Sequence, residues 1–264
     1  MRPARRIVTA REVDLIAGEL ELVGRIAVAS NATFLARIGQ VTVVYKPVAG
    51  ERPLWDFPDG SLVRRESAAY LVSEAFGWDV VPVTCLRDGP LGPGMVQRWQ
   101  EPDRQQDPVD VVTTQAVPLE GWRAVFRGSD ERDRPVTLIH EDSAALRRMA
   151  VFDVVVNNAD RKGGHILPTR QGHRYGVDHG VSFHVEHKLR TVLWGWLGED
   201  LHPAELAGVE RVRANLDGDL GHRLSELLSD AELAALAARC DRLLREGTFP
   251  GPEGEMPAFP WPLF

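Results

Sequence analysis

Residues 158–167, which read NADRKGGHIL, gather charged and polar side chains between two apolar segments. Asp160, Lys162 and His165 stand within six residues, with two glycines between the lysine and the histidine. Residues of these types are also common in solvated turns. A carboxylate, an ammonium and an imidazole on one short loop are nevertheless the groups that acid–base or metal-dependent catalysis uses. We therefore take this stretch as a candidate catalytic loop.

A second carboxylate, Asp178, follows in the sequence GVDHG at 176–180. The intervening residues, HILPT and RYG around RQGH, predict a β-hairpin. Because a hairpin brings its two ends together, we expect Asp160 and Asp178 to lie near each other, with His165 at the hairpin mouth. Carboxylate oxygens are the ligands that Mg²⁺ prefers. Asp160 is therefore a candidate base, and Asp178 and His165 are candidate metal ligands.

Lys46 ends an apolar strand, VVYK, and would bring a positive charge to the same cleft. The chain has 31 basic residues but only three lysines, so each one raises the question of whether a compact ammonium is needed there. Glu66 follows on a predicted helix. A strand lysine held by a helix glutamate, a metal-binding carboxylate and a second carboxylate near an acceptor hydroxyl are the groups of phosphoryl transfer. The plainer interpretation is a solvated lysine and a surface glutamate.

The elements that must position these residues divide the chain into two parts. Alternating apolar residues predict strands over 20–29, over 33–46 with a turn near Gly39, and over 80–84 and 94–98. Helical periodicity predicts helices over 8–17 and 62–76, the second ending at Gly77. We therefore expect a β-rich N-terminal lobe over 1–100 with one inserted helix, followed by a polar hinge over 101–110.

The remaining residues, 111–264, are expected to form a mostly helical lobe that carries the hairpin. Helices are predicted over 144–157, capped by Asp142 or Ser143, and over 203–214, 219–228 and 230–246, the last with a capping box that begins at Ser229. Residues 111–140 are ambiguous, and the proline- and aromatic-rich tail is expected to lie extended on the surface. The predicted fold class is α+β with two lobes.

The composition narrows the class of protein. The chain has 264 residues, 44% of them apolar and 26% charged, which is ordinary for a globular protein. Its net charge of −7 argues against binding to the phosphate backbone of nucleic acids. No apolar run approaches the roughly 18 residues of a membrane span, and the basic start lacks a signal-peptide apolar stretch. The two cysteines form no zinc-finger pattern. We expect a cytoplasmic protein.

Four motifs together resemble the phosphatidylinositol 3- and 4-kinase-like superfamily, whose pattern HipA-type protein kinases share: VYKP at 44–47, the helix of Glu66, NADRKGGH at 158–165 and VDHG at 177–180. The closest likeness is to an actinobacterial kinase-like group. The resemblance implies a protein-kinase-like fold that binds ATP with Mg²⁺ or Mn²⁺. It matches Asp160 to the catalytic-loop aspartate, Asp178 to the metal-binding aspartate, and Lys46, positioned by Glu66, to the phosphate lysine.

The resemblance also implies which residues surround the nucleotide. Gln97, Arg98 and Trp99 would lie at the adenine-contacting hinge. Ser30 and Asn31 would replace a glycine-rich phosphate loop, which this chain lacks, through their backbone N–H groups and side chains.

Two positions depart from the family pattern. Lys162 stands where the family has His or Asn, and it is a candidate contact for the substrate or the γ-phosphate. His165 stands where the family has Asn as a metal ligand, and imidazole suits Mn²⁺ better than Mg²⁺. The sequence thus predicts a phosphotransferase that moves the γ-phosphoryl group of ATP to a hydroxyl of a soluble small molecule or a protein.

Three alternatives stay open. The altered metal position and the missing glycine-rich loop favour a pseudokinase that binds a nucleotide without turnover. A kinase-like fold can also transfer the nucleotidyl group, because a fold does not fix its chemistry. A metallohydrolase built on the histidines of 165–187 is the third alternative, although no strong zinc motif is present.

Overall fold

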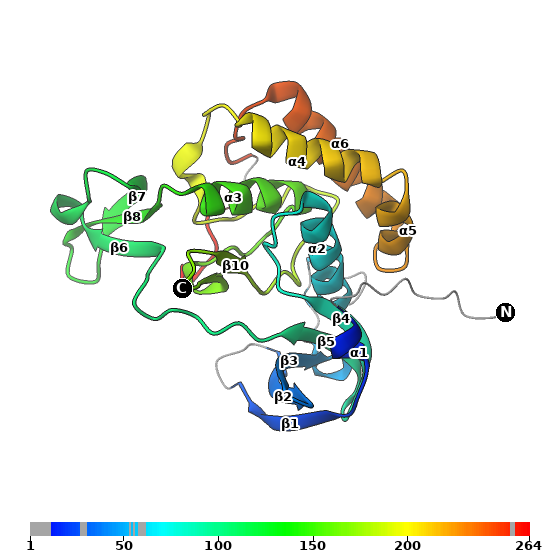
Figure 1. Cartoon of the computed structure of the whole chain (residues 1–264). Helices are drawn as coiled ribbons and strands as arrows, with labels where there is room; N and C mark the ends of the chain where they lie inside the picture. Colours follow the sequence, from blue (N-terminus) through cyan, green and yellow to red (C-terminus); the bar gives the residue numbers. More distant parts are fainter. Residues whose placement is uncertain (1–11, 27–30, 53, 55, 58–61, 254–256) are drawn as a thin grey trace.

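A five-stranded antiparallel sheet forms the first lobe, in the order β1-β2-β3-β5-β4. We describe it from a computed structural model that covers residues 12–26, 31–52, 54, 56–57, 62–253 and 257–264. The strands are β1 Leu20–Arg25, β2 Phe34–Ile38, β3 Val41–Pro47, β4 Thr84–Gly89 and β5 Gly92–Arg98. Along β3 the side chains alternate, so that Val43 and Tyr45 enter the core of the lobe while Val44 and Lys46 point to the opposite face. That face looks toward the second lobe (Figure 1).

Helix α2, Leu62–Phe76, is the element that joins the two lobes. The Glu51 carboxylate accepts hydrogen bonds from the backbone N–H groups of Leu62 and Val63, at 3.1 and 2.8 Å, and so satisfies donors at the first turn. The helix ends at Gly77, whose φ of 69° is the left-handed value expected after a helix. Its sides contact β4 and β5 as well as α3, α4 and α5. The position of α2 is thus fixed from both lobes.

The second lobe combines helices with two small antiparallel sheets. The ambiguous residues 111–140 form strands, in the order β6-β8-β7, so this lobe is less helical than the sequence predicts. A two-stranded hairpin follows α3, as predicted. The bounds are β6 Val109–Thr113, β7 Trp122–Ser129, β8 Pro135–Glu141, α3 Ala144–Val156, β9 Ile166–Pro168, β10 Arg174–Gly176, α4 Pro203–Asn215, α5 Asp219–Ser225 and α6 Asp230–Glu246. Short 3₁₀ turns occur at η1 Val48–Gly50, η2 Thr114–Ala116, η3 Gly163–His165 and η4 Trp194–Trp196.

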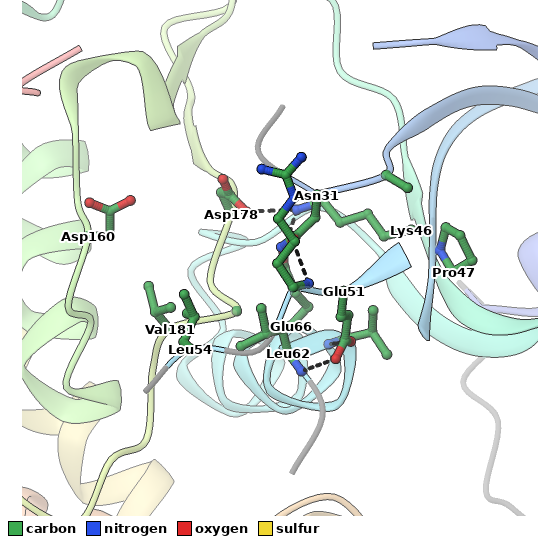
Figure 2. A pocket seen from close by; sticks show the side chains of 14 residues that line it. Asn31, Lys46, Pro47, Glu51, Leu54, Leu62, Glu66, Asp160, Asp178 and Val181 are labelled. Atoms are coloured by element: carbon green, nitrogen blue, oxygen red, sulfur yellow. Dashed lines mark hydrogen bonds and ion pairs between the residues drawn. The ribbon is translucent and has the colours of Figure 1, made fainter. Parts of the chain in front are cut away.

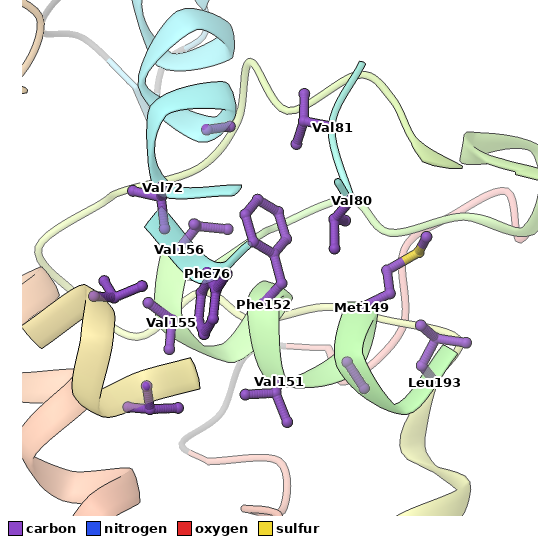
Figure 3. Packing of buried hydrophobic residues seen from close by; sticks show 14 of the residues in the cluster. Val72, Phe76, Val80, Val81, Met149, Val151, Phe152, Val155, Val156 and Leu193 are labelled. Atoms are coloured by element: carbon purple, nitrogen blue, oxygen red, sulfur yellow. The ribbon is translucent and has the colours of Figure 1, made fainter. Parts of the chain in front are cut away.

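The main apolar core lies where α2, α3, α4 and α6 meet. Figure 3 shows Phe76 of α2 beside Phe152 of α3, with their ring centroids 6.1 Å apart. Val80 and Val81 enter the same core from the segment after α2. Ser143 caps α3 by accepting the N–H of Leu146, and Ser229 with Glu232 forms the predicted capping box of α6.

One sequence-based boundary is wrong for an identifiable reason, and another is tested only in part. The strand predicted over 80–84 begins only at Thr84, because Val80 and Val81 are buried in the core of the second lobe and Pro82 has no N–H for a strand ladder. The helix predicted over 8–17 is seen only as α1, Val13–Ile16. Its residues 8–11 lie outside the described part of the chain.

The predicted α+β class with a β-rich first lobe is confirmed. Among the residues that the structure describes, no helix has the length and apolar character needed to cross a membrane.

Candidate functional site

Three ionic side chains meet where the two lobes face each other. Lys46 on β3 donates to Glu66 Oε1 of α2 at 2.6 Å and to Asp178 Oδ1 at 2.8 Å. Glu66 is almost fully buried, and its second oxygen accepts the backbone N–H of His179 at 3.0 Å. One glutamate on the helix therefore holds both the strand lysine and the segment that carries Asp178. The predicted pairing of Lys46 with Glu66 is formed.

The charges of this cluster stabilise one another. Burial alone lowers the pKa of the Lys46 ammonium, but Asp178 and then Glu66 outweigh it and leave that pKa above its ordinary value. The ammonium of Lys46 in turn holds the pKa of Asp178 well below its usual range, against the opposing effect of burial. Lys46 is therefore cationic and Asp178 anionic at neutral pH. Asp178 also has a φ of 63°, a conformation that Asp tolerates better than most residues.

The candidate catalytic loop lies beside this cluster. The Asp160 carboxylate is 3.4 Å from Lys162 Nζ, and its backbone carbonyl is 2.8 Å from His165 Nδ1. His165 Nε2 lies 3.5 Å from Asp178 Oδ2, so the hairpin brings the two predicted metal ligands together. Burial raises the pKa of Asp160, with Asp178 adding to the shift and with His165 and Lys162 opposing it. A carboxyl with a raised pKa is better suited to accept a proton than an ordinary exposed aspartate.

The side chain of Arg161 stabilises this loop through hydrogen bonds. It is fully buried, and it donates from Nε and Nη2 to the two oxygens of Asp153 on α3, each at 2.8 Å. Its Nη2 also lies 2.6 Å from His179 Nε2, and its Nη1 donates to the carbonyl of His165 at 3.1 Å. Burial, followed by the charge of Arg161, lowers the pKa of His179 well below its ordinary value, so the ring is neutral. One guanidinium thus joins the helix, the catalytic loop and the segment after Asp178.

Two asparagines fix the start of the same loop. Asn157 ends α3 with a φ of 54°, and its side chain donates to the carbonyls of His184 and Glu186 at 2.9 and 2.7 Å. Asn158 donates to Asp153 and accepts the backbone N–H of Asp160, both at 3.0 Å. The backbone of Asp160 is therefore held by the residue two positions before it, which leaves its carboxylate free to face the cleft.

Two cavities open on either side of Lys46 and share Asn31, Lys46 and Asp178 in their walls. The first, which we name the hinge cavity, has a volume of about 340 Å³ and extends between Val44 and Leu167 toward 97–100. The second, the front cavity, has a volume of about 380 Å³ and contains Asp160 and Arg52. Figure 2 shows the front cavity, with Asp178 projecting between Lys46 and Asp160.

The comparisons with known proteins cover most of the chain. No protein-family model matches it. Protein Rv2133c of Mycobacterium tuberculosis is 48% identical over an alignment of 264 positions, which covers 94% of this chain and 93% of that protein. The chain belongs to the family of Protein Rv2133c. Among solved structures, the crystal structure of a Helicobacter pylori proinflammatory kinase, CtkA, matches 89% of this chain and 94% of its own with a TM-score of 0.48 and 12% identity. That likeness is too distant to carry an argument.

In this member of the Rv2133c family, the residues that were predicted to contact a nucleotide line the two cavities, as far as the structure describes them. Gln97, Arg98 and Trp99 all line the hinge cavity. Asn31 lines both cavities, and its side-chain oxygen accepts the backbone N–H of Arg52 at 2.9 Å. Ser30 lies outside the described residues. The structure therefore brings Lys46, Asp178 and the hinge residues to one continuous space.

The side chains near Asp178 suit a metal ion that phosphate oxygens also bind. The described residues contain no group of three or more His, Cys, Asp or Glu side chains arranged to hold a metal by themselves. Asp178 and His165 supply a carboxylate and an imidazole, and a cation at this place needs further ligands such as phosphate oxygens and water. His184, which a separate zinc centre would use, instead packs its ring edge-on against Phe57 at 5.2 Å. Two protein ligands suit a cation whose other ligands are phosphate oxygens and water.

The sequence missed the contact between the tail and the catalytic loop. The tail, residues 257–264, does not merely lie on the surface, because the carbonyl of Leu263 accepts the backbone N–H of Gly163 at 2.8 Å. The ring of Phe264 lies where a side chain at Gly163 would have to be. Ala258 anchors the same tail by accepting from Trp194 Nε1 at 2.9 Å. The pair of glycines was the only sequence signal of this close approach.

Proposed function

We propose that the protein is a phosphotransferase that uses ATP and a divalent metal, Mg²⁺ or Mn²⁺, and transfers the γ-phosphoryl group to a hydroxyl acceptor. The observation that carries the proposal is the Lys46–Glu66–Asp178 cluster at the junction of two cavities, with Asp160 facing the second one. The resemblance of the surrounding motifs to the phosphatidylinositol 3- and 4-kinase-like superfamily supports the same conclusion.

The hinge cavity and the residues at its junction with the front cavity would bind the nucleotide. The hinge cavity would hold the base, between Val44 on one side and Leu167 on the other. Lys46 then grips phosphate oxygens, and Glu66 keeps its ammonium aimed at them because it is buried and cannot turn to solvent. Asn31 lies at the junction, where its backbone would approach the phosphates.

Asp178 and His165 would hold the metal, which supplies positive charge to the phosphate oxygens as the bond to the leaving group breaks. Asp178 is bonded to Lys46 and is half-exposed, so its outer oxygen remains accessible on the cleft side. With a nucleotide and its metal bound, Lys46 would contact phosphate oxygens and Asp178 would contact the metal, and these contacts would replace the ion pair between the two side chains.

Asp160 would orient the acceptor hydroxyl and take its proton. The hydroxyl oxygen attacks the γ-phosphorus, the bond from that phosphorus to the bridging oxygen breaks, and ADP leaves with the electron pair. The proton of the hydroxyl passes to the Asp160 carboxylate, whose raised pKa favours this role. Lys162, 3.4 Å from that carboxylate, would contact the transferred phosphoryl group.

The acceptor enters the front cavity and is a soluble small molecule or a protein side chain. The net charge of −7 disfavours an anionic membrane surface as its source. A chain with this composition and an ATP-dependent activity is expected in the cytoplasm.

The test is the identity and rate of the product formed from ATP. Wild-type protein with ATP and metal should release ADP, and Asp160→Ala should lower that rate by roughly 10²- to 10⁴-fold. Asp217→Ala is the matched control, because Asp217 is 79% exposed and forms only a surface pair with Arg213. An unchanged rate in Asp160→Ala would remove Asp160 from this role. Pyrophosphate in place of ADP would assign the protein to nucleotidyl transfer.

A nucleotide-binding pseudokinase is the second candidate. The direct ion pair between Lys46 and Asp178 favours it, because an ammonium already neutralises the carboxylate that a metal would use. This alternative predicts ATP binding that is independent of metal, with no ADP released by wild type or variant.

A further inference from the structure

Helix α2 holds the segment 179–182 at its two ends. The buried Glu66 accepts the backbone N–H of His179 through Oε2 at 3.0 Å. The residue before it on the helix, Arg65, donates from Nη1 to the backbone carbonyl of Ser182 at 2.7 Å. Two adjacent side chains of α2 therefore bind the first N–H and the last carbonyl of this segment.

The segment does not keep its shape through a regular element. It belongs to no helix or strand, and the residues on either side of it, Asp178 and Phe183, have φ values of 63° and 68°. A left-handed conformation is unfavourable for a bulky residue such as phenylalanine and persists only where the surrounding contacts impose it. The shape of this segment therefore depends on its neighbours, and its contacts with α2 are among those that fix it.

The same segment reaches the two carboxylates that are proposed to act on the acceptor and on the metal. It begins directly after Asp178. The carbonyl of Val181 accepts the backbone N–H of Ala159, the residue before Asp160, at 3.0 Å. Val181 lines the front cavity together with Asp160 and Asp178 (Figure 2). A displacement of Ser182, the residue next to Val181, would therefore change the separation of the two carboxylates.

An ion pair fixes the guanidinium of Arg65 at the start of α6. Arg65 is 4% exposed, and its Nη1 lies 2.5 Å from Oε1 of Glu232. The other oxygen of that carboxylate, Oε2, accepts from the backbone N–H and the hydroxyl of Ser229, each at 2.9 Å. The ring of Phe57 packs against the guanidinium, with its centroid 5.2 Å from the guanidinium carbon. The donor that reaches the Ser182 carbonyl is therefore held in place from three sides.

We propose that Arg65 is a positioning residue of the transfer reaction, which acts through the Ser182 carbonyl to fix the separation of Asp160 and Asp178. This inference rests on the proposed function, in which the two carboxylates serve the acceptor hydroxyl and the metal. A displacement of about 1 Å between reacting groups lowers a rate by roughly 10²-fold. Loss of the bond to Ser182 lowers kcat but leaves KM for ATP nearly unchanged, because Lys46 and the hinge cavity take no part in this contact.

The experiment replaces Arg65 without leaving a buried charge behind. In the double variant Arg65→Met with Glu232→Gln, the glutamine keeps the cap of α6, because glutamine serves in a capping box as glutamate does. ADP formation from ATP and Mg²⁺ should show kcat lowered by roughly 10- to 100-fold and KM for ATP changed by less than about threefold. Glu232→Gln alone keeps an acceptor for Arg65 and should keep kcat within about threefold of wild type.

The double variant Arg147→Met with Glu205→Gln is the matched control. Arg147 is an equally buried arginine of α3, which pairs with Glu205, the capping-box glutamate of α4, and donates to the carbonyl of Asp200 at 3.0 Å. None of these three residues lines the hinge cavity or the front cavity. Thermal unfolding measures the stability of both double variants. The control should lose stability to a similar extent and keep the kcat of wild type.

The comparison of the two double variants decides the role of Arg65. Equal kcat values in both, at a temperature where both are folded, would overturn that role and leave the proposed function intact. A loss of kcat in the Arg65 variant alone supports it. No ADP formation by wild type would overturn the proposed function itself and this inference with it.

Discussion

At the scale of single residues, Lys46 is the side chain that joins the two lobes by ion pairs. It sits on a strand face beside Val44, reaches a buried glutamate of the helix and meets Asp178 from the second lobe. Replacing one member of such a set leaves a charge without its partner in a partly buried place, which costs more than the pair itself contributes. The contribution of Lys46 to turnover and its contribution to the stability of the fold can therefore be separated by the choice of substitution.

Lys46→Met and Lys46→Arg should both lower ADP formation by roughly 10²- to 10³-fold, since a placed ammonium is lost or displaced from the phosphates. Their stabilities should differ. The arginine keeps a positive charge against Glu66, whereas the methionine leaves that buried carboxylate uncompensated. Thermal unfolding of both variants beside wild type measures the second effect. Equal turnover in Lys46→Arg and wild type would show that any cation suffices at this position.

Much of this residue-scale picture is predictable from the sequence, because it depends on few spacings. The scarcity of lysine singles out Lys46, and the hairpin after 158–165 predicts that Asp160, His165 and Asp178 converge. The bond between Arg65 and the Ser182 carbonyl is not predictable in the same way. It requires the path of the chain after Asp178 past α2, and no regular spacing in the sequence specifies that path.

At the scale of elements, the candidate catalytic loop is held by contacts with α3 and with the tail. Arg161 ties the loop to Asp153 of α3, and the Gly163 N–H bonds to Leu263 of the tail. Phe264 closes the second contact by packing on Gly163, where it leaves no room for a methyl group. The tail is therefore an element of the site, although it lies about a hundred residues later in the sequence.

Gly163→Ala should displace the ring of Phe264, which is half-exposed at the end of the chain, and should therefore destabilise the fold by less than about 1 kcal/mol and lower turnover with it. The double variant Gly163→Ala with Phe264→Ala removes the clash and should be no less stable than Phe264→Ala alone. Gly24→Ala is the control, because a methyl group there meets no neighbouring atom. Chemical denaturation and ADP formation are measured on all four variants. Additive losses in the double variant would contradict the contact.

The tail and the strands of 109–141 mark the limit of prediction at this scale. Proline and aromatic residues predict an extended segment, but nothing in the sequence says which surface it covers. Residues 111–140 have no clear period, and only pairing with one another reveals β6, β7 and β8. In contrast, α2, α3 and α6 were predictable within a few residues, because each combines helical periodicity with a cap or a glycine stop.

At the scale of the whole molecule, α2 couples the lobes and a buried histidine couples stability to pH. His140 on β8 is fully buried; its Nε2 accepts the backbone N–H of Gly195 at 3.1 Å, and its Nδ1 lies 2.9 Å from the carbonyl of Glu141. Burial lowers the pKa of His140 to about 4. The ring is therefore neutral in the folded protein over a range where an unfolded chain is protonated.

The free energy of unfolding should fall as the pH drops from about 6.5 toward 4, because between these values the unfolded state binds a proton at His140 that the folded state does not. The contribution is fully present above the unfolded pKa, and its loss is on the order of 3 kcal/mol by pH 4. Urea unfolding at several pH values measures the slope. His140→Gln should make the slope smaller but leave the part that the buried His179 contributes, while His202→Gln, with a side chain that is 64% exposed, should leave the slope unchanged. An equal slope in both variants would contradict this assignment.

The central claim is that the cleft between the lobes binds ATP together with a metal at Asp178. The most direct measurement is the thermal stability of wild type and Asp178→Asn, each alone, with ATP, with ATP and Mg²⁺, and with ATP and Mn²⁺. A ligand at 100 times its dissociation constant stabilises a protein by about 2.7 kcal/mol, which such a measurement resolves. We predict stabilisation of wild type that requires both nucleotide and metal and that is lost in Asp178→Asn. Equal stabilisation of both proteins, or none by any nucleotide, would contradict the claim.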